Sequence, residues 1–206
     1  EEFWKRCAPI TGFINGFTTK DVATEQPVMY IGMTGNGIYI AGIIPAMAGT
    51  MPRASCSKRD GQIYLDDAVE FRFQRQKGDK FRIFMINCNG FIYDSLETPG
   101  KHSADSTLYD PEWKQAVASK GNIWQFEAFL PFAAIGGKPA PGDIWKGNFC
   151  VDRAGNLGNG ISLFQAQNYN DESTFGEFYF TGKSQAVGIE KFTSGAAMQP
   201  VVTIFK

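Results

Sequence analysis

Residues 67–74 read Asp-Ala-Val-Glu-Phe-Arg-Phe-Gln, and this stretch does most to decide the fold class. Apolar and polar side chains alternate along it, in the order Val69, Glu70, Phe71, Arg72, Phe73, Gln74. Alternation with a period of two is typical of a β-strand that has one face in a core and the other toward solvent. We therefore expect a strand here, with Glu70 on the solvent face of its sheet.

Two hairpins are predicted around turn residues. The strand-like block Lys80–Asn87 is followed by a Cys-Asn-Gly turn and then by Phe91–Ser95. A Gly-Asn-Gly turn in the same way separates Pro27–Thr34 from Ile38–Ile44. Asn-Gly accepts the positive φ that tight hairpin turns require. These patterns predict an antiparallel sheet that grows by meander.

Further strand-like blocks follow a long polar excursion. Residues 96–122 lose the apolar alternation and are rich in Ser, Asp, Gly and Pro, with a short helix expected over Pro111–Ala118. The later blocks are Ile123–Leu130, Trp145–Val151, Ile161–Gln167, Gly176–Thr181 and Gln199–Phe205. Many short strands separated by turn residues favour an all-β antiparallel sandwich of the immunoglobulin-like type.

The composition fits one domain that spans residues 1–206. Of these residues 43% are hydrophobic and 20% charged, and sandwiches of this length commonly form a single domain. The net charge of −1 provides no field to hold nucleic acid or an anionic membrane. Apolar runs such as Ile38–Met47 are broken by Gly and Pro, which argues against membrane insertion. We expect a secreted, periplasmic or cell-surface protein whose leader has been removed.

The four cysteines are Cys7, Cys56, Cys88 and Cys150. They form no Cys-x-x-Cys pair, and with a single histidine in the chain they do not suggest a zinc site. We expect buried free thiols. The alternative is a disulfide between Cys88 and Cys150, if their strands are neighbours.

Five motifs, in chain order, resemble those of the family 9 carbohydrate-binding modules and of the wider group of DOMON-like sandwiches. They are YLDDAVEF at Tyr64–Phe71, FMINCNG at Phe84–Gly90 with Tyr93-Asp94 after it, WQFEAFLPF at Trp124–Phe132, GDIWKGNF at Gly142–Phe149, and Phe175-Gly176. The resemblance covers most of the chain. It implies an antiparallel sandwich that performs no chemistry and holds a sugar between two aromatic side chains.

The resemblance places the two clamp aromatics at Tyr64, six residues before Glu70, and at Tyr169, six residues before the Phe-Gly pair. The family's usual residue at both positions is Trp, and Tyr keeps the flat face that stacks on a pyranose ring. The resemblance also makes Glu70 a contact to sugar hydroxyls. The alternatives are loop packing for the tyrosines and, for Glu70, a cross-strand ion pair with Arg82.

Two further residues belong to the expected site. The family's arginine after the clamp strand falls at Met85 in this chain, so Arg82 is the candidate to replace it. Trp113, in the expected helix, is the candidate for a larger binding surface. Its alternative role is that of a core or cover residue.

Catalysis is not expected. The carboxylates Glu127, Asp66 and Asp67 stand in strand and turn patterns that suit structure better than glycoside hydrolysis. His102, the single histidine, lies in a polar loop, and no nucleophile elbow is present. Family members often bind Ca²⁺, and the loop carboxylates that are candidates to hold it are Asp66, Asp67, Asp94, Asp105 and Asp110.

The leading hypothesis is a non-catalytic carbohydrate-binding module that belongs to a secreted polysaccharide-degrading or surface-attached protein. Its partners would be an oligo- or polysaccharide and other domains of that larger protein. One alternative is a structural or protein-interaction sandwich whose sugar site has decayed, which the missing arginine favours. The other is a haem-binding domain of the DOMON type, in which His102 and a Met would hold the haem.

Overall fold

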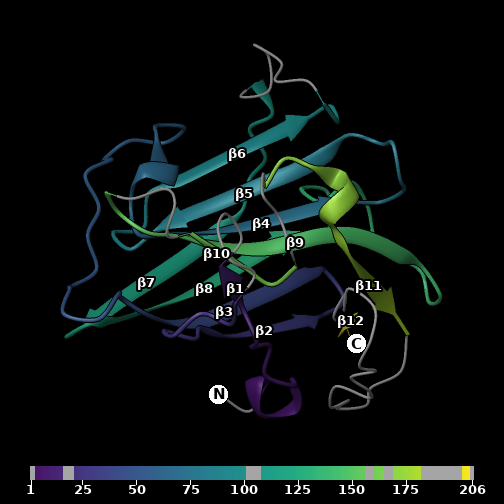
Figure 1. Cartoon of the computed structure of the whole chain (residues 1–206). Coiled ribbons are helices and arrows are strands. Elements are labelled where there is room, and N and C mark those ends of the chain that lie inside the picture. The colour runs from purple at the N-terminus through teal and green to yellow at the C-terminus, as the bar shows by residue number, and fades with distance from the viewer. Residues whose placement is uncertain are drawn as a thin grey trace.

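The chain forms two β-sheets packed face to face, as the computed structural model shows for residues 3–15, 21–100, 108–155, 160–164, 169–181 and 201–204 (Figure 1). The larger sheet has the order β1 (Ile14–Asn15), β10 (Ile161–Ser162), β9 (Ile144–Asp152), β4 (Ala68–Gln74), β5 (Phe81–Asn87) and β6 (Ile92–Glu97). Beside them β9 also pairs with β11 (Gly176–Phe180), which pairs with β12 (Val201–Ile204). The smaller sheet has the order β2 (Val28–Met33), β3 (Gly37–Pro45), β8 (Ile123–Pro131) and β7 (Lys114–Lys120).

The core lies between the sheets and is dominated by aromatic side chains. Phe71 of β4 lies 5.5 Å, between ring centroids, from Phe126 of β8 in the opposite sheet and 5.6 Å from Phe149 of β9. Trp124 and Trp145 are buried in the same core. Rings of this size bury large apolar areas, so they supply most of the adhesion between the sheets. The alternation along residues 67–74 is confirmed, because its apolar members face this core.

The predicted all-β sandwich is confirmed, and its pairing is antiparallel except for the parallel β11–β12 pair. Both predicted hairpins are present, as β2–β3 and as β5–β6. Most later blocks form strands close to the expected bounds. The strand expected over Ile161–Gln167 is the two-residue β10, and residues 165–167 of that prediction lie outside the described residues.

The helix expected over Pro111–Ala118 is wrong, because residues 114–120 form the edge strand β7. Gln115 and Val117 are half-buried, whereas the alternate residues of β7 are exposed. Lys, Gln and Ala are good helix formers, but helix propensity is a weak preference. Pairing with β8 satisfies the backbone N–H and C=O groups of this segment and outweighs that preference.

The helices of the described residues are short 3₁₀ turns: η1 (Trp4–Arg6), η2 (Ile63–Leu65) and η5 (Glu172–Thr174). Within the described ranges, no helix has the length and apolarity that crossing a bilayer would require. The four cysteines are free thiols, as expected, although Cys7 and Cys56 are only half-buried.

The N-terminal turn η1 packs on the outer face of the smaller sheet. Phe3 lies 5.7 Å from Tyr39, and Tyr39 lies 4.6 Å from Phe129, between ring centroids. Trp4 beside them donates a hydrogen bond from Nε1 to Glu127. The buried polar side chains of the molecule gather elsewhere, on the larger sheet.

Candidate functional site

The candidate site lies on the outer face of the larger sheet, away from the core. Residues that oppose each other in an antiparallel pair point to the same side of the sheet. Glu70 of β4 opposes Met85 of β5 and Cys150 of β9, and Arg72 opposes Asn148 of β9. These residues point outward because their neighbours along β4 face the core. All five are nevertheless buried, so Glu70 is not the solvent-facing residue we expected.

Glu70 and Arg72 form an ion pair beneath the surface. Arg72 Nη2 contacts Glu70 Oε2, and the side chains of Arg72 and Glu70 are 3% and 2% exposed, in that order. Burial by itself lowers the pKa of Arg72, but the Glu70 carboxylate, with Cys150 and Asp152, outweighs burial and raises it. The guanidinium therefore stays charged. Its Nε has no hydrogen-bond partner among the described residues.

Residues 169–175, the cover segment, lie over these strands and contact β4 through two side chains. Arg72 Nη1 donates to the side-chain oxygen of Asn170 at 2.6 Å. Gln74 Nε2 donates to the Glu172 carboxylate. Arg72 and Gln74, two residues apart on β4, thus contact Asn170 and Glu172, which are two residues apart in the cover segment.

The cover segment also holds itself together. Asp171 caps η5, because its side chain accepts from the backbone N–H of Ser173 at 3.0 Å. At the other end Phe175 packs edge-to-face on Phe81 of β5, with ring centroids 5.4 Å apart. The segment is therefore an ordered layer with its own turn and its own apolar anchor.

Tyr169 begins the cover segment and lies against the ion pair. Its ring centroid is 5.7 Å from Arg72 Cζ, its ring packs on Cys150, and its hydroxyl donates to the Ile161 carbonyl at 3.2 Å. Burial raises the pKa of this hydroxyl well above its ordinary value, so Tyr169 is a neutral donor. Only 6% of the residue is exposed.

Asp152, opposite Ala68 at the end of β9, brings a second carboxyl to the same outer face. Burial raises the pKa of Asp152 well above its ordinary range, and the nearby Glu70 carboxylate raises it further. Burial likewise raises the pKa of the Cys150 thiol, which makes it a poor nucleophile.

Several buried polar atoms of this face lack a hydrogen-bond partner among the described residues. They are Arg72 Nε, Gln74 Oε1, Asp152 Oδ2, Ser95 Oγ and Glu97 Oε2. Ser95 belongs to this face because it opposes Ile83, which opposes Arg72. A buried polar atom without a partner is costly, so this group of atoms makes the outer face of the larger sheet the candidate for a binding site.

Tyr64 lies in η2, at the rim of the same face. It is 39% exposed, and its hydroxyl accepts from Gln62 Nε2 at 3.3 Å. Its neighbour Ile63 is buried and belongs to the same small apolar cluster as Phe175 of the cover segment. Tyr64 therefore offers an exposed ring beside the face that Tyr169 covers. That the two tyrosines form a clamp stays a prediction.

Arg82 does not join Glu70. It opposes Phe73 in the β4–β5 pairing and therefore points to the core side of the sheet. There its Nε donates to the Tyr109 hydroxyl at 3.3 Å. The alternative of an ion pair between Glu70 and Arg82 is wrong, because the guanidinium beside Glu70 is that of Arg72.

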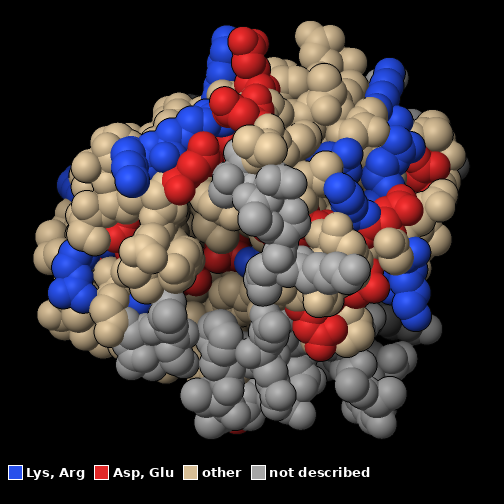
Figure 2. Space-filling model, turned by 90° about the horizontal axis from the view of Figure 1, so that it is seen from above, with Lys and Arg blue, Asp and Glu red and all other residues tan. Residues whose placement is uncertain are grey.

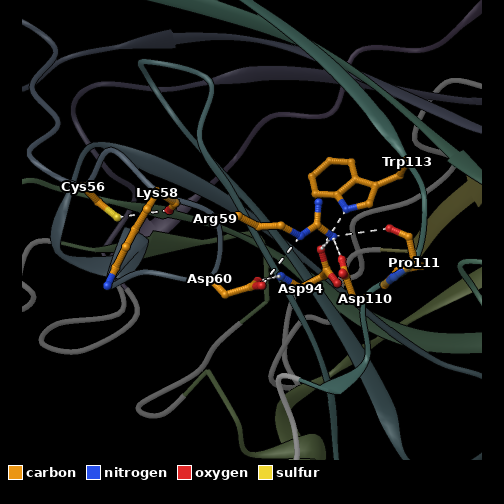
Figure 3. A network of polar contacts seen from close by, with 8 residues as sticks. All are labelled: Cys56, Lys58, Arg59, Asp60, Asp94, Asp110, Pro111 and Trp113. Carbon is orange, nitrogen blue, oxygen red and sulfur yellow. Dashed lines mark hydrogen bonds and ion pairs between the residues drawn. The ribbon is translucent and has the colours of Figure 1, made fainter.

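Trp113 also lies on the core side, where it packs edge-to-face on Phe84 at 5.5 Å between ring centroids. Its Nε1 donates to Asp94 Oδ2 at 3.0 Å, and Figure 3 shows the Arg59 guanidinium in contact with the carboxylates of both Asp94 and Asp110. Burial raises the pKa of Asp94 to about 6, although Trp113 and Arg59 act against it. Trp113 therefore packs in the core, which was the alternative to a role in a larger sugar-binding surface.

Two of the candidate calcium ligands instead hold loops in place. Asp66 accepts hydrogen bonds from the Ser55 backbone N–H at 2.8 Å and from Asn87 Nδ2 at 2.9 Å. Asp67 accepts from the Arg53 backbone N–H at 2.8 Å. Such N–H donors occupy the oxygens that Ca²⁺ would need. In the part of the chain that the structure describes, no cluster of Asp, Glu, His and Cys is arranged to hold a metal ion.

The other carboxylates and the histidine add no catalytic arrangement. Glu127 is exposed on the outer face of the smaller sheet, on the opposite side of the sandwich from Glu70, and accepts from Trp4 at 2.9 Å. Asp105 and His102 lie outside the described residues.

Sequence reasoning did not identify Arg72, Asp152 or Asn170 as site residues. A signal existed for the first two, because both stand at outward positions of strands that lie inside the larger sheet. Asn170 had no comparable signal, since its contact with Arg72 depends on how the cover segment folds.

Comparisons with known proteins identify the fold. No protein-family model and no curated protein matches the chain. A family 9 carbohydrate-binding module from Caldicellulosiruptor kristjanssonii, solved in complex with glucose, is 15% identical with a TM-score of 0.61 over 91% of each chain. The structure of a family 9 module from the same organism in complex with cellotriose is 15% identical, with a TM-score of 0.62 over 93% of this chain and 92% of that chain. A candidate carbohydrate-binding protein from Bacteroides uniformis is 16% identical, with a TM-score of 0.67 over 84% of this chain and 86% of that chain. The chain therefore has the family 9 module fold, as the resemblance implied.

Proposed function

We propose that this domain is a non-catalytic carbohydrate-binding module and that its sugar site is the outer face of the larger sheet. The observation that carries the proposal is the group of unpartnered buried polar atoms around the Glu70–Arg72 ion pair, beside the exposed ring of Tyr64. Solved structures with the same fold hold glucose and cellotriose.

The chemistry of the face suits a neutral sugar. A sugar hydroxyl both donates and accepts, so it can accept from Arg72 and donate to a carboxylate or amide oxygen such as Glu70 or Gln74. The apolar C–H face of a pyranose stacks on an aromatic ring, which Tyr64 offers. Figure 2 shows Lys and Arg interspersed with Asp and Glu over one face of the molecule, not gathered into a patch of one sign that would hold a polyanion.

The proposal places the domain in a secreted or cell-surface protein, where a module of this kind would hold a polysaccharide for other domains of the same protein. The support is the fold shared with carbohydrate-binding modules.

A specific observation favours a second candidate, a structural or protein-interaction sandwich whose sugar site has decayed. Asn170 and Glu172 already take hydrogen bonds from Arg72 and Gln74, and Tyr169 is buried. In this candidate the cover segment fills the former site permanently.

Titration calorimetry separates the two candidates. The purified domain would be titrated with glucose, cellotriose, xylotriose, laminaritriose and mannotriose, and the polymers would be tested by affinity electrophoresis. A binding module takes up a related subset of these sugars. Absence of binding to every sugar and polymer would overturn the proposal in favour of the decayed site.

We also expect no catalysis. Among the described residues, Glu70 and Asp152 are both buried and Arg72 holds Glu70 in an ion pair, so these two carboxyl groups are not exposed to a glycosidic bond. Incubation with the same oligosaccharides should release no new reducing ends. Release that scales with protein concentration, and that Glu70→Gln abolishes, would contradict this expectation.

A further inference from the structure

We propose that Arg72 donates a hydrogen bond to the bound sugar and that Asn170 of the cover segment is its internal substitute, which the sugar displaces. This inference rests on the proposed function and assigns two residues of the site. The cover segment is then a closed state of the binding site and not a permanent plug.

The first step of the argument is the hydrogen bonding of Arg72. Its Nη2 binds Glu70, its Nη1 binds the Asn170 side-chain oxygen at 2.6 Å, and its buried Nε has no partner among the described residues. A guanidinium has five N–H donors in a rigid fork. Nη2 is held by Glu70, a neighbour on the same strand, whereas Nη1 is held by the neutral amide of Asn170. Arg72 can therefore exchange this amide for another neutral acceptor while its ion pair stays in place.

The second step is the chemistry of the substitute. The amide oxygen of Asn170 is a neutral acceptor, as a sugar hydroxyl oxygen is. The pair Gln74 and Glu172 repeats the arrangement two residues along, and Gln74 Oε1 is left without a partner among the described residues. The cover segment thus uses polar side chains to satisfy a polar face that a packed core would satisfy with apolar ones.

The third step is access. Arg72 is 3% exposed, so a ligand reaches it only when Tyr169 and Asn170 move away. The cover segment has its own cap at Asp171, which lets it keep its turn while its contacts with β4 are exchanged. The exchange conserves the hydrogen bond of Arg72, which limits the free energy of opening.

The experiment uses the oligosaccharide that binds most tightly in the calorimetric titrations described above. Its dissociation constant is measured for two variants that are expected to change binding in opposite directions. Asn170→Ala removes the internal competitor and should tighten binding by up to about tenfold, the equivalent of one hydrogen bond to a charged group. Arg72→Lys keeps the charge beside Glu70 but loses the fork, and it should weaken binding by about tenfold or more.

Two control variants match these changes. Arg75→Met alters an arginine just beyond β4 that lies over Trp145 and should leave the dissociation constant unchanged. Thr34→Ala removes a hydroxyl that donates to the Gly37 carbonyl in the β2–β3 turn of the smaller sheet, and it should also leave the dissociation constant unchanged. If Arg72→Lys does not fold, Asn170→Ala and the hydrogen exchange below supply the test in its place.

Hydrogen exchange supplies a second measurement. Sugar binding should speed amide exchange in residues 169–175, because the segment leaves β4, whereas a rigid site would slow it. Wild-type protein that binds no sugar overturns the proposed function and this inference with it. Wild-type protein that binds, with Asn170→Ala weaker or Arg72→Lys unchanged, overturns this inference alone.

Discussion

The position of the Glu70–Arg72 pair is easier to explain by binding than by stability. Taking both charges out of water costs several kcal/mol per ion, and replacing such a pair by apolar residues is often neutral or stabilising. The pair lies on the outer face of the sheet and not in the core between the sheets. A buried charged pair at a place where stability does not require it favours a role in recognition.

At the scale of the residue, Tyr64 is the aromatic side chain whose role is easiest to test. If its exposed ring stacks on the sugar, Tyr64→Ala should weaken binding by about 1–3 kcal/mol without affecting the fold. Leu65→Ala is the matched control, because Leu65 is adjacent and 40% exposed. Calorimetry measures both changes. Equal effects of the two substitutions would contradict a stacking role for Tyr64.

Asp94 predicts a pH dependence of stability. Its pKa is raised to about 6 in the native protein, so between pH 4 and 7 the native state binds more protons at this group than the unfolded state does. The contribution of Asp94 is therefore fully present at low pH and is lost as the pH rises through about 6. Relative to Asp94→Asn, the wild type should lose on the order of 2–3 kcal/mol of unfolding free energy from pH 4 to 7.

Urea denaturation across this pH range tests the prediction. Glu112→Gln removes a carboxylate next to Trp113 that is exposed, and it should show a much smaller change with pH. A wild-type stability that rises with pH relative to Asp94→Asn would show that Arg59 dominates over burial at this site.

At the scale of the element, the packing of β4 against β9 depends on a glycine. A Cβ at Gly147 of β9 would lie 2.0 Å from the backbone oxygen of Arg72 and 2.8 Å from the Phe178 ring. Gly147→Ala should therefore push the two strands apart, lower the unfolding free energy by about 1–3 kcal/mol and weaken sugar binding through Arg72. Gly35→Ala is the control, since a Cβ there meets nothing within 4 Å. Equal stability of the two variants would contradict the close approach.

The strands with a strong apolar period could be predicted from the sequence, and those without it could not. β4 and β5 carry Phe and Ile at core positions, so their pattern and their place in the sheet agree. β7 carries only Val117 as an apolar contact to the core, and pairing with β8, which no local pattern reveals, decides its structure. The same limit applies to the site, because Asn170 reaches Arg72 across 98 residues of sequence.

At the scale of the whole molecule, the two outer faces of the sandwich differ. The N-terminal turn with Phe3 and Trp4 packs on the smaller sheet through aromatic contacts. The larger sheet is covered by a segment that contacts it through the aromatic rings of Tyr169 and Phe175 and also through the polar side chains of Asn170 and Glu172. The polar contacts can be exchanged for ligand contacts, so the part of the larger sheet around Arg72 and Gln74 is the one suited to a reversible partner.

The whole molecule also predicts how the protein responds to removal of metal ions. Asp66, Asp67 and Asp94 all accept from N–H donors, and these donors take the place of a cation in stabilising the carboxylates. A ligand that binds only the native state raises the melting temperature, so a resident Ca²⁺ would make stability sensitive to a chelator. We expect the same melting temperature in excess EGTA and in millimolar CaCl₂. A lower temperature in EGTA that Ca²⁺ restores would show that carboxylates elsewhere in the chain hold the ion.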